Sequence, residues 1–257
     1  MRSRIRGVLA AFSLAACAFA TAGEPTQLAP LHIIPTENVS PELIAADGPV
    51  RVRLVSPDAQ GLATVLGGKL PAGQSWFEYV IDQYPQLPGP ATRTWLESTF
   101  VIDYTEPEFE PLRKELGLRK TRTTRAELVE YVAGLVEASA ERSWDLASVV
   151  ARKRRGDCSE HAVLSAALAR LQGIPARVVV GAVLVSDGNK FGTFGHAWAE
   201  LREDGQWKVA DAALFDMADV TLRYIPIGLL EDEGMGYGMD LMRAMRTWVE
   251  RVVVVGH

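Results

Sequence analysis

Cys158, His196 and Asp211 are the residues whose types and settings could together perform covalent chemistry in this sequence. A cysteine thiolate is a strong nucleophile, a histidine moves protons near neutral pH, and a carboxylate can fix the tautomer and ring angle of that histidine. Cys158 would attack a carbonyl and form a thioester, while His196 would take the thiol proton and later protonate the leaving group. We therefore expect a cysteine enzyme with these three catalytic residues.

The residues around Cys158 predict a helix that carries the thiol at its first position. Asp157 is a natural N-cap, Glu160 at the third helical position completes a capping box, and the helix should end near Gln172, before a glycine and a proline. Unpaired backbone N–H groups at a helix start stabilise an anion and could also face a developing oxyanion. Asp157 is thus expected to support the nucleophile.

An Asp-Gly turn at 204–205 relates His196 to Asp211 through strand register. In a two-residue hairpin the facing pairs place Asp211 opposite Trp198 on one face of the sheet, and His196 then becomes the diagonal neighbour of Asp211. Diagonal neighbours are roughly 7–8 Å apart, near enough for an imidazole and a carboxylate to hydrogen-bond, whereas a slip of one residue would place Asp211 on the other face. Trp198 would shield this hydrogen bond from water.

Each of these residues also has a purely structural interpretation. Most free cysteines are small buried hydrophobes, and Trp198 could belong to the core. A lone histidine at a strand start is commonly half-buried, and a lone aspartate near a strand end commonly belongs to a turn. Because His161 follows Cys158 by three residues, a metal site with His196 and Asp211 is a further alternative. A second closely spaced pair of ligands is missing, so we expect neither metal nor cofactor.

The rest of the chain predicts an α+β fold in which the cysteine helix packs on an antiparallel sheet bearing His and Asp. We expect a signal peptide over 1–22, a small β-rich region over 23–105 and the catalytic domain over 106–257. The elements expected besides those above are strands at 51–55, 76–81, 94–103, 177–185, 220–227 and 248–255, and helices at 108–118, 124–136, 144–153 and about 239–245.

The N-terminus has the pattern of a secretory signal: three arginines, an apolar stretch and small residues at 20–22. We expect cleavage after Ala22 and a periplasmic or secreted protein. A lipobox at 14–17 is the alternative, with Cys17 lipidated, and a membrane would be a partner only in that case. Either way Cys158 is the one cysteine of the folded part, which is unusual for an exported chain because such compartments favour disulfides.

The charge balance opposes nucleic acid as a partner. The formal net charge is −5, and it becomes −8 once residues 1–22, with three arginines and no acid, are removed. Binding to phosphates requires a basic surface, and the sequence has no basic stripe with interleaved aromatic residues. The sequence does not indicate an oligomeric state.

Four blocks of sequence, in order, resemble the bacterial transglutaminase-like superfamily of papain-like cysteine enzymes. They are GDCSEHA at 156–162, GIPARVVVG at 173–181, GHAWAE at 195–200, and Trp207 with Asp211. The resemblance covers roughly residues 120–215 and implies that Cys158 is the nucleophile, His196 the base and Asp211 the orienting acid. The chain departs from the family at Ala212, where a proline is frequent.

Together these observations lead us to expect an exported enzyme that acts on amide or peptide bonds of a protein or peptide substrate. Hydrolysis by a protease or amidase is favoured over cross-linking to an amine, since nothing marks a lysine-binding channel. The alternative is a transglutaminase-like module that keeps the fold, has lost turnover, and serves binding or assembly in the cell envelope.

Overall fold

The computed structural model describes residues 33–81, 87, 95–117, 123–139, 144–215, 219–230, 244 and 246–256. Its helices are α1 Pro41–Ala45, α2 Ala59–Val65, η3 Pro107–Phe109, α3 Glu110–Gly117, α4 Arg125–Leu135, α5 Ala147–Lys153 and α6 Cys158–Leu171. Its strands are β1 Thr36–Glu37, β2 Val50–Val55, β3 Trp76–Ile81, β4 Glu137–Ala138, β5 Arg155–Gly156, β6 Ala176–Ser186, β7 Phe191–Glu203, β8 Gln206–Ala210, β9 Thr221–Leu230 and β10 Arg251–Gly256. The predicted signal peptide and the expected helix near 239–245 lie outside the described residues, apart from Ala244.

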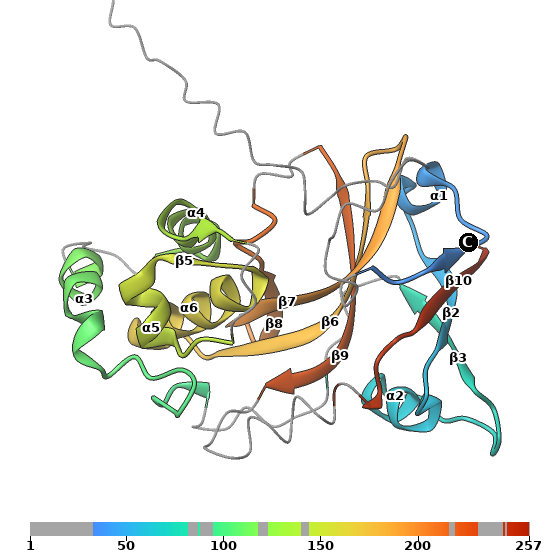
Figure 1. Cartoon of the computed structure of the whole chain (residues 1–257), viewed down its shortest axis with the longest axis horizontal. Helices are drawn as coiled ribbons and strands as arrows, with labels where there is room; N and C mark the ends of the chain where they lie inside the picture. The colour runs from blue at the N-terminus through green and yellow to red at the C-terminus, as the bar shows by residue number, and fades with distance from the viewer. Residues whose placement is uncertain are drawn as a thin grey trace, which may run out of the picture.

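The fold is α+β, as predicted, and its centre is an antiparallel sheet in the order β8-β7-β6-β9. In Figure 1, α3, α4, α5 and α6 lie to the left of this sheet. The second sheet lies to its right, together with α1 and α2. Helix α6 packs on the apolar positions Ala197, Ala199 and Leu201 of β7, which alternate with His196 and Trp198 along the strand. The cysteine helix therefore lies against the sheet that carries the histidine.

The hairpin of β7 and β8 has the register that the Asp-Gly turn predicts. Ala199 faces Ala210 and Glu203 faces Gln206, while Asp204 and Gly205 both have positive φ, at 50° and 77°. A type I′ turn needs positive φ at both central residues, which is the reason for this dipeptide.

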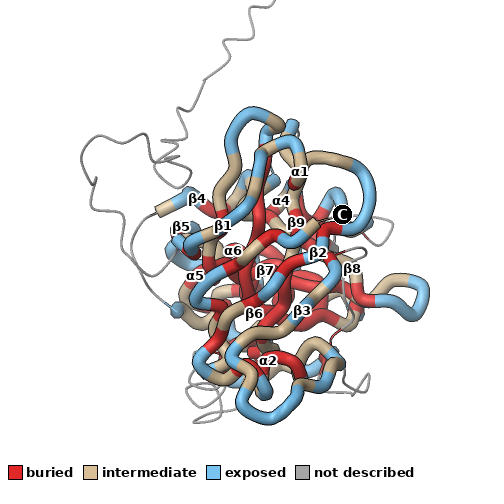
Figure 2. Tube along the Cα trace, turned by 90° about the vertical axis from the view of Figure 1, so that its right-hand side faces the viewer, coloured by how far each residue is buried: buried red, intermediate tan, exposed pale blue. Residues whose placement is uncertain are grey.

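The second sheet has the order β1-β10-β2-β3 and so contains strands from both ends of the described chain. Strand β10 lies antiparallel to β2, so the C-terminal strand belongs to the sheet of the N-terminal region rather than to the central one. Apolar residues of β2 and β10 pack on Ala182 and Leu184 of β6 and on Ile225 and Ile227 of β9. Figure 2 shows the consequence: the tube of β6 and β7 is buried for most of its length between these layers. The domain boundary at 105/106 stays a prediction.

The strand expected at 94–103 is wrong over its described part. From Trp95 to Asp103 the backbone makes turns and bends, and the Thr99 N–H donates to the Ile102 carbonyl at 3.2 Å. Val101 and Ile102 are adjacent and both buried, whereas a strand points neighbouring side chains to opposite faces.

Helix α5 begins at Ala147, three residues later than predicted, because its cap comes from elsewhere in the chain. Leu146 precedes it and offers no side-chain cap. The carboxylate of Asp103 instead accepts the Ser148 N–H at 2.7 Å. Helix α3 is also shorter at its start than expected: it begins at Glu110 after a 3₁₀ turn, which leaves Pro111 in its first turn, where a proline is tolerated.

Candidate active site

Cys158 is the first residue of α6, as the capping pattern predicts. The Asp157 carboxylate accepts the Ser159 N–H at 2.8 Å, and the Glu160 carboxylate accepts the Asp157 N–H at 2.9 Å. The thiol is half-buried and forms no disulfide. Its position at the helix start places it at the positive end of the helix dipole, which stabilises negative charge.

Glu160 is fully buried and ties this helix start to two neighbouring segments. Besides the Asp157 N–H it accepts the Asp145 N–H at 3.1 Å, and its stem fills the space beside Gly156, where a Cβ could not fit. Burial raises the pKa of Glu160 to about 7, against the lowering effect of those two N–H donors. Glu160 therefore links the start of α6 to the segment at Asp145, and its carboxyl group titrates near neutral pH.

His196 and Asp211 are joined across the β7–β8 hairpin by a hydrogen bond. His196 Nε2 and Asp211 Oδ2 are 2.7 Å apart, and both side chains are 6% exposed. Asp211 directly follows β8, at the position that the register places opposite Trp198. The diagonal relationship expected from the sequence is thus present in the structure.

The electrostatics of the pair favour the imidazolium form of His196. Burial alone would lower the pKa of His196, but the charge and hydrogen bond of Asp211 outweigh it and raise that pKa well above its ordinary value. The Cys158 side chain, which hydrogen-bonds the imidazole, adds to the rise. Burial likewise opposes ionisation of Asp211, yet the adjacent imidazolium keeps its pKa below the ordinary value. Nε2 is taken by Asp211, so Nδ1 is the ring nitrogen left to serve the sulfur.

Tyr224 of β9 completes the surroundings of Asp211 and was missed in the sequence. Its hydroxyl donates to Asp211 Oδ2 at 2.9 Å, while the N–H groups of Ala213 and Leu214 donate to Oδ1 at 3.1 and 3.3 Å. Burial raises the pKa of Tyr224 far above its usual range, so the hydroxyl stays a donor. A tyrosine within an otherwise largely apolar strand was the available signal, but strand patterns do not reveal which carboxylate it meets.

Trp198 is buried and lies beside His196, while its role in excluding water from the His196–Asp211 bond stays a prediction. Its ring stacks on the imidazole with centroids 6.0 Å apart and an interplanar angle of 20°, and it packs on Tyr224 at 5.0 Å. The space for the indole depends on Gly181 of β6, because a Cβ added there would lie 2.7 Å from Trp198 Cη2. The rings of Trp198 and Tyr224 thus both lie beside the imidazole, with centroids 6.0 and 6.5 Å from it.

His161 does not join these residues as a metal ligand would. Its Nδ1 lies 2.7 Å from the Asp157 carbonyl oxygen, and burial lowers its pKa. Within the described parts of the chain, no three His, Cys, Asp or Glu side chains are grouped so as to hold a metal ion. His161 therefore secures the first turn of α6.

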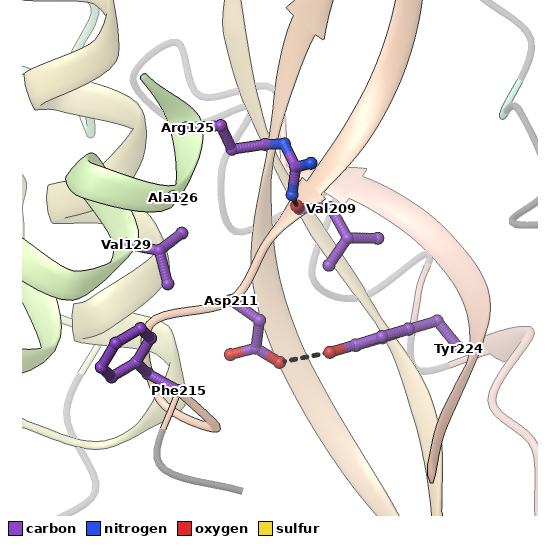
Figure 3. Close-up of a pocket in the computed structure, with 7 residues that line it drawn as sticks. All are labelled: Arg125, Ala126, Val129, Val209, Asp211, Phe215 and Tyr224. Atoms are coloured by element: carbon purple, nitrogen blue, oxygen red, sulfur yellow. Dashed lines mark hydrogen bonds between the residues drawn. The ribbon is translucent and has the colours of Figure 1, made fainter. Parts of the chain in front are cut away.

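A pocket of about 340 Å³ lies beside Asp211, on the side of α4. In Figure 3 its apolar lining comes from Ala126 and Val129 of α4, from Val209 of β8 and from Phe215, while Asp211 forms one wall. Arg125 and Tyr224 complete it.

None of the helices in the described ranges has the length and apolar character needed to cross a membrane.

A helix that begins with a cysteine and an antiparallel sheet that carries a bonded His–Asp pair define the fold class of the papain-like cysteine enzymes. Residues 112–212 match the family model of the transglutaminase-like superfamily core, so the similarity to that superfamily is shown for this segment of the chain. No curated protein matches the sequence.

Solved structures with a similar fold include a proposed cysteine protease from Cytophaga hutchinsonii, 21% identical, with a TM-score of 0.43 and coverage of 63% of this chain and 50% of that one. The periplasmic domain of TgpA from Pseudomonas aeruginosa is 20% identical, with a TM-score of 0.38 and 55% of each chain covered. The same domain bound to ethylmercury is 19% identical, with a TM-score of 0.36 and coverage of 55% of this chain and 57% of that one. The chain spans about half the length of these structures.

Proposed function

We propose that the protein is an exported cysteine enzyme that cleaves amide or peptide bonds through a thioester on Cys158. The observation that carries the proposal is the 2.7 Å bond between His196 and Asp211, with the thiol of a helix start against the same imidazole. An imidazolium stabilised by a carboxylate can hold the thiolate before attack and can then protonate the departing amine. The backbone N–H of Cys158 is the one suited to face the oxyanion, because the N–H groups of Ser159 and Glu160 donate to the Asp157 carboxylate.

Water is the proposed acceptor of the acyl group. After the amine leaves, a neutral His196 can take a proton from water, which attacks the thioester carbonyl, and the carbon–sulfur bond breaks to return Cys158. The polar groups around Asp211 are already paired, and no carboxylate in the lining of the neighbouring pocket other than Asp211 could attract a lysine ammonium. Export is proposed from the pattern of residues 1–22.

The test measures whether Cys158 is an activated thiol and which acyl group becomes attached to it. Iodoacetamide at neutral pH should alkylate Cys158 in the folded protein faster than it alkylates free cysteine, and His196→Ala should slow the reaction. Wild-type protein mixed with native cell extract should yield an acyl adduct on Cys158 by peptide mass spectrometry, with Cys158→Ala as the control. A thiol that reacts only after unfolding, with no adduct, would instead support the binding-module alternative.

A further inference from the structure

One edge of β7 is only partly covered, and His196 lies in the uncovered stretch. Strand β6 pairs with the opposite edge of β7 along most of its length. On the partly covered edge, β8 pairs from Ala199 onward, and Ile33 forms an isolated antiparallel bridge with Phe194. Among the residues that the structure describes, none pairs with this edge at positions 195–198. This stretch is the open edge beside the catalytic histidine.

Backbone N–H and C=O groups face the open edge at two positions. The Ile34 N–H donates to the Thr193 carbonyl at 2.8 Å, so the backbone of Thr193 faces this side of β7. The Thr36 hydroxyl donates to the Thr193 hydroxyl at 2.6 Å and holds the incoming chain against the strand. Because successive residues of a strand direct their backbone groups to alternate sides, Gly195 and Ala197 face the same side as Thr193. A sheet edge with unpaired N–H and C=O groups is a template for a further extended chain.

The antiparallel bridge sets where the residues before Ile33 would lie if they continued along β7. Each step back along the chain from Ile33 meets one step forward along β7. This register places His32 opposite Gly195 and Leu31 opposite His196. The direction of the bridge would therefore carry the segment to the catalytic histidine within two residues.

Strand β8 limits how far such pairing can extend. It takes the edge of β7 from Ala199 onward, so the last position free for pairing is Pro30 opposite Ala197. A chain cleaved after Ala22 keeps residues 23–32 before the bridge, which is more than the two or three residues that the open edge needs. The length of the segment therefore fits the open edge.

A segment in this register would close the side of His196 that Asp211 leaves open. Asp211 lies 2.7 Å from the imidazole, at the position opposite Trp198. Facing residues of antiparallel strands have Cα atoms about 4.5–5.5 Å apart and side chains on one face, so Leu31 would lie beside the imidazole that serves the thiol. A substrate amide has to approach this imidazole to exchange its proton, and it would therefore compete with the segment for the same space.

We propose that residues 30–32 of this chain bind the open edge as a short antiparallel strand and form an autoinhibitory contact. The inference rests on the proposed function, because obstruction of the site matters only if Cys158 is a reactive thiol. The hydrogen bonds exchanged between His32 and Gly195 have to break before a substrate reaches the site. A change that removes the segment from the open edge therefore activates the enzyme.

His32→Pro in the full mature chain tests the contact. Proline has no N–H to donate to the Gly195 carbonyl, so the segment should leave the open edge. Amide hydrogen exchange at Gly195 and Ala197 should then become at least about tenfold faster than in wild type. Alkylation of Cys158 by an iodoacetylated alanine tripeptide amide should also become about tenfold faster. Iodoacetamide should gain less, because a compact reagent needs less of the obstructed space.

Gln27→Pro is the matched control. It introduces the same residue into the same segment, but its position in the register faces Glu200, which already pairs with Val209 of β8. Exchange and alkylation should therefore match wild type. Effects as large as those of His32→Pro would contradict the register.

The outcomes separate the contact from the proposed function. Equal exchange at Gly195 and Ala197 in wild type and His32→Pro overturns the binding of the segment while the thiol enzyme stands. Faster exchange in His32→Pro with an unchanged rate of alkylation by the tripeptide reagent overturns the obstruction. A folded protein in which neither reagent alkylates Cys158 contradicts the proposed function and with it the inhibition, and exchange alone then decides whether the segment lies on the open edge.

Discussion

Tyr224 and His196 both hydrogen-bond the same oxygen of Asp211, at 2.9 and 2.7 Å. The tyrosine comes from β9 at one edge of the central sheet, whereas Asp211 follows β8 at the other edge. Its side chain therefore links the two edges of the sheet. The hydrogen bond from its hydroxyl disperses part of the negative charge of Asp211 that would otherwise act on His196.

Replacing Tyr224 with phenylalanine tests this link. The ring can still pack on Trp198, but Asp211 loses one donor, so its negative charge acts more fully on His196 and raises the pKa of the imidazole further. We expect turnover to fall by about tenfold, as for a lost hydrogen bond to a charged group, and the alkaline limb of the pH–rate profile to move upward. Unchanged turnover and an unchanged limb would contradict a positioning role.

Asp211→Asn should move the same limb in the opposite direction. The amide is neutral, so burial is no longer opposed and the pKa of His196 falls towards or below its ordinary value. The imidazolium is then lost at a lower pH, and activity should decline at least about a hundredfold, because the tautomer is also no longer fixed. The pH dependence of Cys158 alkylation reads out this shift without a known substrate. A limb that stays in place would mean that Asp211 does not govern His196.

Glu160 should make the folded protein less stable as the pH rises. Its folded pKa of about 7 exceeds its ordinary value of 4.5, so the folded state binds more protons than the unfolded state between these values. The stabilisation is fully present below pH 4.5 and is lost as the pH rises through 7. In Glu160→Gln the drop in the free energy of unfolding between pH 5 and pH 8, measured with urea, should be smaller than in wild type. Equal drops would refute the assignment, and exposed Glu130→Gln is the matched control.

Gly181→Ala should disturb the packing of Trp198. The added methyl would meet the Ile225 carbonyl oxygen and would lie 2.7 Å from Trp198 Cη2, so the indole or the strand has to shift. We expect a loss of about 1–3 kcal/mol of stability, with slower alkylation of Cys158 because the imidazole loses its stacked support. Gly134→Ala in α4 is the control: its Cβ would meet nothing within 4 Å, so a small gain of stability is expected. A Gly181 variant as stable as wild type would show that the strand relaxes freely.

The N-terminus of the exported protein should begin at Gly23. N-terminal sequencing of protein from the periplasmic fraction or the medium measures this directly, and the intact mass shows whether residues 1–22 are gone. A mature chain that begins with an acylated Cys17 would favour the lipoprotein alternative, and a chain that keeps Met1 in the cytoplasm would contradict export.

Local sequence was enough to predict the parts of the site that depend on near neighbours. The capping box of Asp157 and Glu160 places Cys158 at a helix start, and the Asp-Gly turn sets the register of His196 against Asp211. Both follow from geometry within a few residues or within one hairpin, where hydrogen-bond patterns leave few alternatives.

The distant elements that meet the site became known only from the folded chain. No local pattern says that Tyr224 reaches Asp211, that Asp103 caps α5, or that β10 joins the sheet of β1, β2 and β3. These contacts depend on strand order and on the direction of side chains from separate elements, and the turns at 95–103 were mistaken for a strand for the same reason. Periodicity reports which face of an element is apolar, whereas the element that covers that face is chosen by the packing of the whole chain.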